Sequence, residues 1–542
     1  MLTVGFGGSI HDYATAVADE DRILIAIEDE RLTRVRYALD SDNPLRPSFE
    51  YCLRSIPEIA DASVRKAAND TLAHCPLLSS APPVWINHHY AHAASSFYTS
   101  TFEDAIIIVA DGAGSVTGAF DEWHLRETTS LFYGQGNTIK RLARVDGRKH
   151  CPAAQNDFQN LTEDSIGDLY EAVTCAIGFS PLQEGKTMAL AAYGDDRFVR
   201  ALNERVAIRD GFSFSVDLGG PNGVMNYLDS VTSDPSQDDL PFDVKAALAY
   251  AVQYQTERLI RSLLNASMQY CNSRNLCFVG GVGLNAVAMG KLPEMAPFRS
   301  VHQISAPGDS GTAIGAALAL QVSRHQEGKT LRWPWTPYLG KQYRVGCEDL
   351  SGLVVQECAT DEHLLSLICE SVLSGKIVGL FRSGSEFGPR ALGHRSLVAS
   401  PEYPGIQWKM NQLKSREWFR PIAPMTLESG DSVLCSGERL MQAARPRAGS
   451  AIEARAALHV DGSARVQLVD EEADPFLLQL LLMLRRHGAK ALLNTSFNLH
   501  GEPIVETPED AVRSFVAAPI DALAVEHLFA TKRTPLEDLA LH

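Results

Sequence analysis

Two histidines and two aspartates occupy positions from which they could bind one metal ion. His88 and His92 lie four residues apart in "HHYAH", so on a helix both imidazoles face the same side, about 5–6 Å apart at Cβ. Asp111 follows the apolar run "IIIVA", and Asp309 lies in "SAPGDSG", before a helical pattern. Two imidazoles and two carboxylates suit iron(II), manganese or zinc better than magnesium or calcium. An isolated pair of this spacing is often only exposed or capping histidines, so convergence of the four side chains is a prediction.

A second group of side chains could bind anions. Between residues 382 and 420 basic residues outnumber glutamates, and they are Arg382, Arg390, Arg395, Lys409, Lys414, Arg416 and Arg420. They are interleaved with glycine, proline and apolar residues, which is more typical of a pocket than of a helix face. Arginine forks bind phosphate groups bidentately. The alternative interpretation is a solvated charged surface.

Two glycine-containing stretches could bring the backbone close to a ligand. "GGVGLN", residues 280–285, follows an apolar strand pattern and opens toward a helix, so its amides could approach a sugar or a phosphate. "EGKTMALAAYG", residues 184–194, predicts another glycine turn, which carries Glu184 and Lys186. A charged surface loop is an equally good interpretation of this second stretch.

The elements that must position these residues alternate between strands and helices. "AIIIVADGAG" predicts a buried strand that ends at Asp111 and is followed by a turn, although an ordinary Asp-Gly turn would look the same. "VWIN" predicts a short buried strand, and the helix that follows from His88 has Asn87 as its N-cap. A long helix is predicted from Asp243. This alternation predicts an α/β architecture, with a connector, "LRWPWTPYLG", that ends near residue 340.

Composition limits the class of protein. The chain has 542 residues, 45% hydrophobic and 21% charged residues, and a net charge of -17, which predicts a globular protein of two or more domains. The negative charge argues against bulk binding to nucleic acid or to an anionic membrane. No apolar stretch has membrane-spanning length, the N-terminus does not resemble a signal peptide, and the ten cysteines include no CxxC pair. We therefore expect a cytoplasmic protein.

The motifs occur in an order that resembles one family over nearly the whole chain. In the first half they are "HDYATAV", "HHYAHAASSFY", "DGAG", "EGKTMALAAYG", "GGVGLN" and "APGDSGTAIGAA". In the second half they are "EFGPRALGHRS", "REWFRPIAP", "HVDGSARVQ" and "LLNTSFNLHGEPIVETPEDA". Together they resemble the NodU/CmcH-type O-carbamoyltransferases, which modify antibiotics and nodulation factors. The resemblance implies an actin/Hsp70/sugar-kinase-like domain over residues 1–340, related to threonylcarbamoyl-transfer enzymes, and an α+β YrdC-like domain over residues 341–542.

The resemblance also implies a reaction and a set of site residues. The YrdC-like domain would make carbamoyladenylate from carbamoyl phosphate and ATP, with magnesium accompanying the ATP. The N-terminal domain would transfer the carbamoyl group to an alcohol, with a divalent metal, iron(II) in the first instance, held by His88, His92, Asp111 and Asp309. The adenosine part would be held by Gly281, Gly283, Asn285 and Gly308. Lys186 and Arg36 would act in the same pocket. From the basic run, we expect Arg390, Lys414, Arg416 and Arg420 to bind carbamoyl phosphate and ATP. Asn494 and Ser496 in "NTSFN" could complete that site, although an ordinary polar strand end is nearly as good an interpretation.

The acceptor hydroxyl needs a base, and His11 in "IHDYA" is the candidate; alternatively, His11 is a turn residue packed beside Asp12. The expected acceptor is a sugar or macrolide hydroxyl of a secondary metabolite, and a homodimer would be unsurprising. The rival interpretations are an ATP-dependent kinase, a tRNA threonylcarbamoyl transferase-like enzyme and a nucleotide- and metal-binding regulator without turnover. The fused second domain with "EFGPRALG" and "REWFRPIAP" argues against the first two, as does the lack of a basic RNA-binding surface. The presence of all four proposed metal ligands argues against the third.

Overall fold

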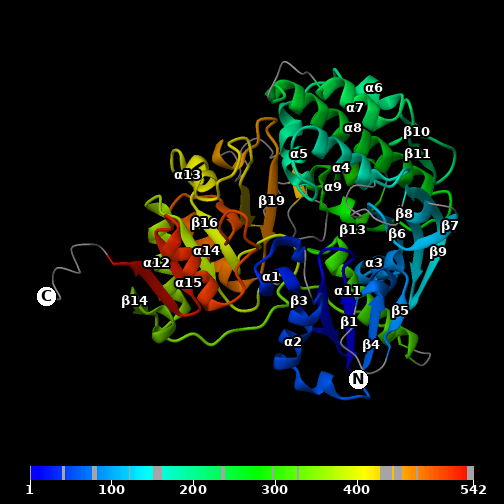
Figure 1. Cartoon of the computed structure of the whole chain (residues 1–542). Helices are drawn as coiled ribbons and strands as arrows, with labels where there is room; N and C mark the ends of the chain where they lie inside the picture. Colours follow the sequence, from blue (N-terminus) through cyan, green and yellow to red (C-terminus); the bar gives the residue numbers. More distant parts are fainter. Residues whose placement is uncertain are drawn as a thin grey trace.

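The computed structural model describes residues 2–39, 43–75, 82–120, 123–150, 161–233, 239–295, 298–325, 329–427, 442–444, 455–471 and 474–533. It has two lobes that lie side by side (Figure 1). We call the elements from β1 to α11, residues 3–323, the N lobe, and those from β14 to β22, residues 353–532, the C lobe. No helix or regular strand interrupts the predicted connector at residues 331–340. The α/β prediction is confirmed.

The first sheet of the N lobe has the strand order β3-β2-β1-β4-β5. Its strands are β1 (Thr3–Gly7), β2 (Ala14–Ala18), β3 (Ile23–Glu28), β4 (Arg65–Asn69) and β5 (Val84–Ile86). Helix α11 (Thr312–Ser323) packs on one face and α2 (Arg46–Ser55) on the other. Gly5 and Gly7 permit the close approach of α11, because a Cβ at either would lie only 2.0 or 2.2 Å from backbone atoms of Ala313.

The second sheet carries the strand that ends at the predicted metal site. Its order is β13-β12-β6-β8-β7, with β9 paired to β8. The strands are β6 (Asp104–Ala110), β7 (Val116–Phe120), β8 (Trp123–Gln135), β9 (Thr138–His150), β12 (Asn275–Val279) and β13 (Ser300–His302). Alternate residues of β6 face opposite cores, one shared with α3 (His88–Phe97) and the other with α8 (Phe242–Ser267). A strand covered on both faces explains the continuous apolar run before Asp111.

The remaining helices and strands of the N lobe are all shorter than α8. They are α1 (Asp29–Thr33), α4 (Ile166–Ala176), α5 (Glu184–Leu190), α6 (Val199–Asn203), α7 (Val224–Thr232), α9 (Ala286–Gly290), α10 (Leu292–Met295), β10 (Val206–Ile208) and β11 (Phe214–Val216). Helices α4 and α8 pack in the same core as one face of β6. The strands β10 and β11 form a separate antiparallel pair.

One nine-stranded sheet organises the C lobe, in the order β14-β22-β21-β15-β16-β20-β17-β19-β18. Its strands are β14 (Leu353–Glu357), β15 (Val378–Phe381), β16 (Arg395–Ala399), β17 (Ala423–Leu427), β18 (Gln442–Ala444), β19 (Ala464–Val469), β20 (Leu492–Ser496), β21 (Ala522–Val525) and β22 (Leu528–Lys532). Helices α12 (Asp361–Leu373) and α14 (Pro475–Arg486) share one core cluster with it. Helices α13 (Ile406–Leu413) and α15 (Pro508–Ala517) share the other, so the sheet is covered on both faces.

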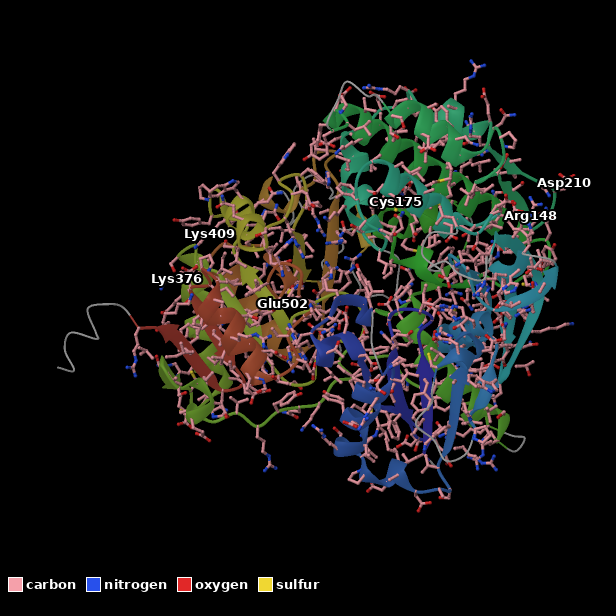
Figure 2. All side chains as sticks on the ribbon, in the orientation of Figure 1. Arg148, Cys175, Asp210, Lys376, Lys409 and Glu502 are labelled. Carbon is pink, nitrogen blue, oxygen red and sulfur yellow. The ribbon has the colours of Figure 1, made fainter. Side chains whose placement is uncertain are left out.

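Short hydrogen bonds join the lobes near α1. Arg34 donates to the carbonyl oxygens of Ile504 and Pro503 at 2.6 and 2.8 Å, and its guanidinium lies 3.5 Å from Glu502, which is labelled in Figure 2. Buried Arg31 donates to the carbonyl oxygen of Gly388 at 2.6 Å. Gly388 has a φ of +110°, and a Cβ there would lie 2.4 Å from the Ser305 carbonyl oxygen. The C-lobe loop that carries Arg390 is therefore pressed against the N lobe.

Most of the predicted elements are present, with three differences. The helix from His88 begins where expected, and Asn87 caps it by accepting from the Tyr90 amide. The stretch "EGKTMAL" forms helix α5 and not a glycine turn, and its residues from Thr187 to Leu190 are buried. Strand β5 is mostly exposed and not buried, since it forms an edge of its sheet. The sequence did not indicate the long hairpin of β8 and β9. Within the described residues, no helix is both long and apolar enough to cross a membrane.

Candidate functional site

The four predicted metal ligands converge in the N lobe. One ligand atom from each of the four lies within 4.8 Å of the others, and all four residues are buried. The Nε2 atoms of His88 and His92 are 3.1 Å apart. His88 Nε2 lies 3.0 Å from Asp111 Oδ2, and Asp309 Oδ1 lies 3.6 Å from both imidazole nitrogens. Residues separated by more than 200 positions in the sequence thus meet because α3, the end of β6 and the turn before α11 adjoin.

Neighbouring groups orient the side chains of the four predicted ligands. The backbone amide of Gly281 donates to Asp111 Oδ1 at 2.9 Å, which leaves Oδ2 directed at His88. His88 Nδ1 lies 3.4 Å from the hydroxyl of Thr71. His89 turns away from the cluster, and its Nδ1 lies 2.8 Å from Ser130 Oγ. Such partners of the second ring nitrogen or the second carboxylate oxygen commonly fix metal ligands in place.

The electrostatics of this cluster favour a bound cation. Burial alone would lower the pKa of His88, but Asp309 and Asp111 raise it well above its ordinary value. Burial alone would raise the pKa of Asp111, but the bonds to His88 and His92 hold it well below the usual range. Burial lowers the pKa of His89 to about 4, so this histidine is neutral. Two inward carboxylates and two imidazoles in a buried pocket form a donor set that fits a divalent metal.

His11 lies in the turn between β1 and β2, close enough to Asp309 and Asp111 for their charges to raise its pKa. Its Nδ1 is 3.1 Å from Asp12 Oδ2, and its side chain is 20% exposed. Burial lowers its pKa, but Asp12, Asp309 and Asp111 outweigh this and raise it to about 9. A cation held between Asp111 and Asp309 would cancel part of their field and so lower the pKa of His11. His11 therefore contacts Asp12, as the alternative interpretation of the sequence expects, and it also lies near the His₂Asp₂ cluster.

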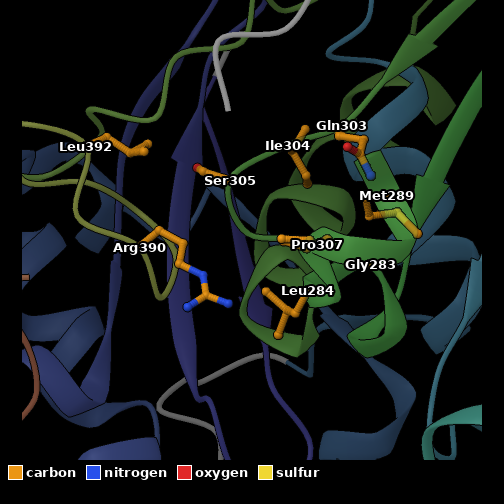
Figure 3. Close-up of a pocket in the computed structure, with 10 residues that line it drawn as sticks. Gly283, Leu284, Met289, Gln303, Ile304, Ser305, Pro307, Arg390 and Leu392 are labelled. Carbon is orange, nitrogen blue, oxygen red and sulfur yellow. The ribbon is translucent and has the colours of Figure 1, made fainter. Parts of the chain in front are cut away.

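The predicted nucleotide turn follows β12 and borders a hollow between the lobes (Figure 3). The hollow has about 460 Å³ of empty space, part of it open solvent, and is lined by Gly283, Leu284, Ala286, Met289, Gln303, Ile304, Ser305, Pro307, Arg390 and Leu392. Arg390 reaches from the C-lobe loop toward Leu284 in this view. Asn285 instead caps α9 and donates to Gln253 at 2.9 Å. Gly308 lies beside Leu284.

The structure brings three predicted anion-binding residues of the C lobe together. Lys414 Nζ donates to the carbonyl oxygen of Ser496 at 2.6 Å and lies 3.2 Å from its Oγ. Arg416 donates to Thr495 Oγ1 at 2.9 Å and lies 3.5 Å from Ser496 Oγ. Burial lowers the pKa of Arg416 to about 9, helped by the nearby charges of Arg420, Arg390 and Arg36. Since a guanidinium keeps its proton in proteins, this repulsion is relieved best by a bound polyanion.

Asn494 does not join this group. Its side chain is 1% exposed, and its amide donates to the Ala391 carbonyl oxygen at 2.8 Å and to Gln467 at 3.0 Å. It therefore anchors the loop next to Arg390. The asparagine that contacts the cations is Asn498, whose Oδ1 accepts from Lys414 and from Ser496 Oγ. Asn498 stands in the same quoted motif, so only the assignment within "NTSFN" differs from expectation.

Two further arginines extend the cation cluster. Arg465 on β19 lies within range of the charges of Arg390, Arg420 and Arg416. Burial, together with repulsion by these charges, lowers the pKa of Arg465 well below its ordinary value. Among the described residues, neither Arg465 nor Arg390 has a side-chain hydrogen bond or ion pair. Arg36 of the N lobe faces the same group, because its charge acts on Lys414, Arg416 and Arg420. "HVDGSARVQ" was the one sequence signal that could have indicated Arg465.

The other basic residues of the predicted run have structural partners. Arg382 lies over the ring of Phe476, with 3.2 Å between its Cζ and the ring centroid. Arg395 donates to the carbonyl oxygens of Arg382 and Ser383 at 2.6 and 3.0 Å. Lys409 pairs with Asp521 at 2.9 Å. Lys186, expected in the nucleotide pocket, has its Nζ 2.7 Å from Glu417 of the C lobe.

Comparisons with protein families match both lobes. The family described as "Carbamoyltransferase N-terminus" matches residues 58–318, and that described as "Carbamoyltransferase C-terminus" matches residues 369–532. An uncharacterised protein of Synechocystis is 30% identical over 98% of this chain and 96% of its own. The nodulation protein NolNO of Sinorhizobium fredii is 28% identical over 97% of this chain and 79% of its own. The 3'-hydroxymethylcephem-O-carbamoyltransferase of Streptomyces clavuligerus is 27% identical over 95% and 96%.

Solved structures show more distant likeness. Full-length HypF in its phosphate- and nucleotide-bound form has a TM-score of 0.41 and 15% identity, covering 60% of this chain and 56% of its own. A ROK hexokinase from Thermus thermophilus has a TM-score of 0.32 and 13% identity, covering 60% of this chain and 100% of its own.

Proposed function

This chain belongs to the carbamoyltransferase family, and from that we propose that it is an ATP-dependent O-carbamoyltransferase with two sites. The C lobe makes carbamoyladenylate from carbamoyl phosphate and ATP with magnesium, and the N lobe transfers the carbamoyl group to an alcohol. The observation that carries this proposal is the pairing of a buried His₂Asp₂ cluster in one lobe with a cation cluster in the other.

The cation cluster suits the first half of the reaction. Carbamoyl phosphate and ATP bring several phosphate groups into one site, and each guanidinium can bind phosphate through two parallel N–H groups. In this half-reaction water releases phosphate from carbamoyl phosphate, and the carbamate oxygen attacks the α-phosphorus of ATP, with pyrophosphate leaving. Lys414, Arg416 and Arg420 would bind the transferred groups. Arg390 and Arg465, which have no side-chain hydrogen bond or ion pair among the described residues, would neutralise the leaving phosphates.

The His₂Asp₂ cluster suits the second half. Carbamate is a poor electrophile because nitrogen donates into its carbonyl, and the mixed anhydride with AMP supplies a good leaving group. A divalent metal at the cluster, which we propose to be iron(II), would stabilise charge that develops on the carbamoyl or phosphate oxygen. His88, His92, Asp111 and Asp309 would hold it. The acceptor oxygen attacks the carbamoyl carbon, AMP leaves, and His11 takes the proton of the acceptor.

The acceptor is proposed to be a hydroxyl of a small secondary metabolite. Relatives named for nodulation and for a hydroxymethylcephem support this class. The test is to incubate the purified chain with carbamoyl phosphate, ATP, magnesium, iron(II) and a panel of hydroxylated natural products. We expect phosphate release that requires ATP, and a product heavier by one carbamoyl group in mass spectrometry. A regulator without turnover would release no phosphate, and that outcome would reject the proposal.

Replacing His11 by alanine should separate the two half-reactions. His11→Ala should still hold metal and still make carbamoyladenylate, because its side chain lies in the N lobe. Transfer to the alcohol should slow by about 10²–10⁴-fold, the usual cost of losing a positioned base. The measurement follows intermediate and carbamoylated product together over time, with metal content determined on the same preparation. Normal transfer by this variant would leave His11 as a turn residue paired with Asp12.

A further inference from the structure

The segment from Lys414 to Arg420 belongs to the cation cluster and to the lobe interface at once. Lys414 and Arg416 contact the end of β20. Between Arg416 and Arg420, the intervening side chains turn toward the N lobe. Phe419 is 7% exposed and packs in the N-lobe core that contains α4 and α8. The two arginines are therefore separated along the chain by three residues that face the other lobe.

Glu417 is the charged member of these three residues. Its Oε1 lies 2.7 Å from Nζ of Lys186, which belongs to α5 of the N lobe. Its Oε2 lies 3.8 Å from Nη1 of Arg420 and, among the described residues, has no hydrogen-bond partner. Lys186 is held in turn over the ring of Phe179, at 5.3 Å from the centroid. One carboxylate thus connects a cation of the N lobe with a cation of the proposed anion site.

Aromatic contacts hold the same segment beside the ion pair. The indole of Trp418 stacks on the ring of Phe242, with 5.4 Å between centroids and 28° between planes. Tyr193, which follows α5, contacts Trp418 and Phe419 edge-on at 5.5 and 6.3 Å. Such contacts add stability beyond their buried area and restrict geometry. In this arrangement of the lobes they hold Trp418 and Phe419 beside the Glu417 carboxylate, which lies opposite Lys186.

We propose that Glu417 is a positioning residue: anchored by Lys186 of the N lobe, it holds Arg420 and the adjacent Arg416 in the geometry that binds polyphosphate. The C-lobe anion site is then complete only while α5 is docked against it. This inference rests on the proposed function, which supplies the phosphate ligands. It assigns Lys186 a role through Glu417 in place of direct contact with the nucleotide.

The direction in which anion affinity changes when Glu417 is replaced distinguishes a positioning role from an effect of its charge alone. Removing a negative charge from a cluster of cations would by its field strengthen the binding of an anion. If Glu417 positions the arginines, its loss must instead weaken that binding. Lys186 gives a second comparison, because field effects of Lys186→Met and Glu417→Gln have opposite signs and would cancel in the double variant. If Lys186 acts only through Glu417, the double variant should bind the anion with the same affinity as Glu417→Gln alone.

The experiment measures binding of inorganic pyrophosphate to the full chain by isothermal titration calorimetry at fixed low salt. We expect the dissociation constant to rise about two- to fivefold in Glu417→Gln, the range for partly exposed ion pairs. Lys186→Met should show a similar rise, the double variant no further rise, and Lys186→Arg near wild-type binding. Lys409→Met removes an ion pair of similar length within the C lobe and is the matched control, with unchanged binding.

The inference would be overturned if Glu417→Gln bound pyrophosphate as tightly as the wild type or more tightly. It would also be overturned if the effects of the two substitutions on affinity cancelled in the double variant. Thermal unfolding of each variant verifies that the chain is folded, and Lys186→Met tests the same pair if Glu417→Gln is unstable. Failure of the proposed function is distinct: the wild type would bind pyrophosphate normally but release no phosphate from carbamoyl phosphate with ATP.

Discussion

Arg416→Ala is expected to lose carbamoyladenylate formation while keeping carbamoyl transfer. Arg416 lies among Arg420, Arg390 and Arg36, donates to Thr495, and is close to Ser496. A cation positioned on transferring phosphate groups typically contributes about 10²–10³-fold in rate. The measurement is ATP-dependent release of phosphate and pyrophosphate from carbamoyl phosphate. When preformed carbamoyladenylate is supplied, transfer to the acceptor should proceed at the wild-type rate, because the metal cluster and His11 are intact.

Lys409→Met is the control for this variant. Lys409 belongs to the same basic run but pairs with Asp521, which directly precedes β21, so its loss should leave adenylate formation unchanged. If Arg416→Ala converts carbamoyl phosphate and ATP at the normal rate, Arg416 belongs to a solvated face of the C lobe. If Arg416→Ala loses transfer from the preformed intermediate as well, the assignment of the two half-reactions to separate lobes is wrong.

Asp111→Asn and His92→Ala are expected to abolish metal binding and transfer. His92→Ala removes one donor from a set whose members lie within 4.8 Å of one another. Asp111→Asn removes a negative charge, and because its oxygen must still accept from the Gly281 amide, its NH₂ group takes the place of the inward Oδ2. Wild-type protein should carry one divalent metal per chain, and the two variants should carry almost none. Elemental analysis of purified protein provides the measurement, with far-ultraviolet circular dichroism to verify the fold. Asparagine is chosen at position 111 because it preserves side-chain volume.

His89→Gln provides the matched control for the metal prediction. His89 is a neighbour of His88 on the same helix, but its imidazole is bonded to Ser130 and is neutral. Its replacement should leave the metal content unchanged. Equal metal in wild type, Asp111→Asn and His92→Ala would contradict the assignment of the cluster. Retained adenylate formation in both variants is expected, since the C-lobe cations do not contact the metal ligands.

The convergence of the four His₂Asp₂ residues could be predicted because each signal is local. Spacing of four on a helix directs His88 and His92 to one side, and the apolar run before Asp111 predicts a buried strand with a carboxylate at its end. Asp309 stands before a helix of small residues, which the structure confirms as α11. Periodicity and strand ends are properties of a few neighbouring residues, so they can be read without knowing the tertiary contacts.

The residues of the anion site could be predicted only in part from local sequence signals. The sequence indicated a basic segment, but basic composition does not tell which side chain finds a carboxylate, a ring or a ligand. Asn494 and Asn498 are both in "NTSFN", yet only Asn498 contacts Lys414, because Asn494 points toward Ala391 and Gln467. Arg465 joins the cluster from a strand that the sequence places 45 residues after Arg420.

By itself the sequence determined the α/β class and indicated the four residues that converge in the His₂Asp₂ cluster, because hydrophobic period and residue spacing are set within one element. The tertiary structure alone decided that Lys186 meets Glu417, that Arg36 faces the C-lobe cations, and that the Arg390 loop presses against Ser305. These pairings join residues more than 80 positions apart, and they depend on how two lobes pack. The direction of a long side chain follows the partners that packing supplies, not the identity of its neighbours in sequence.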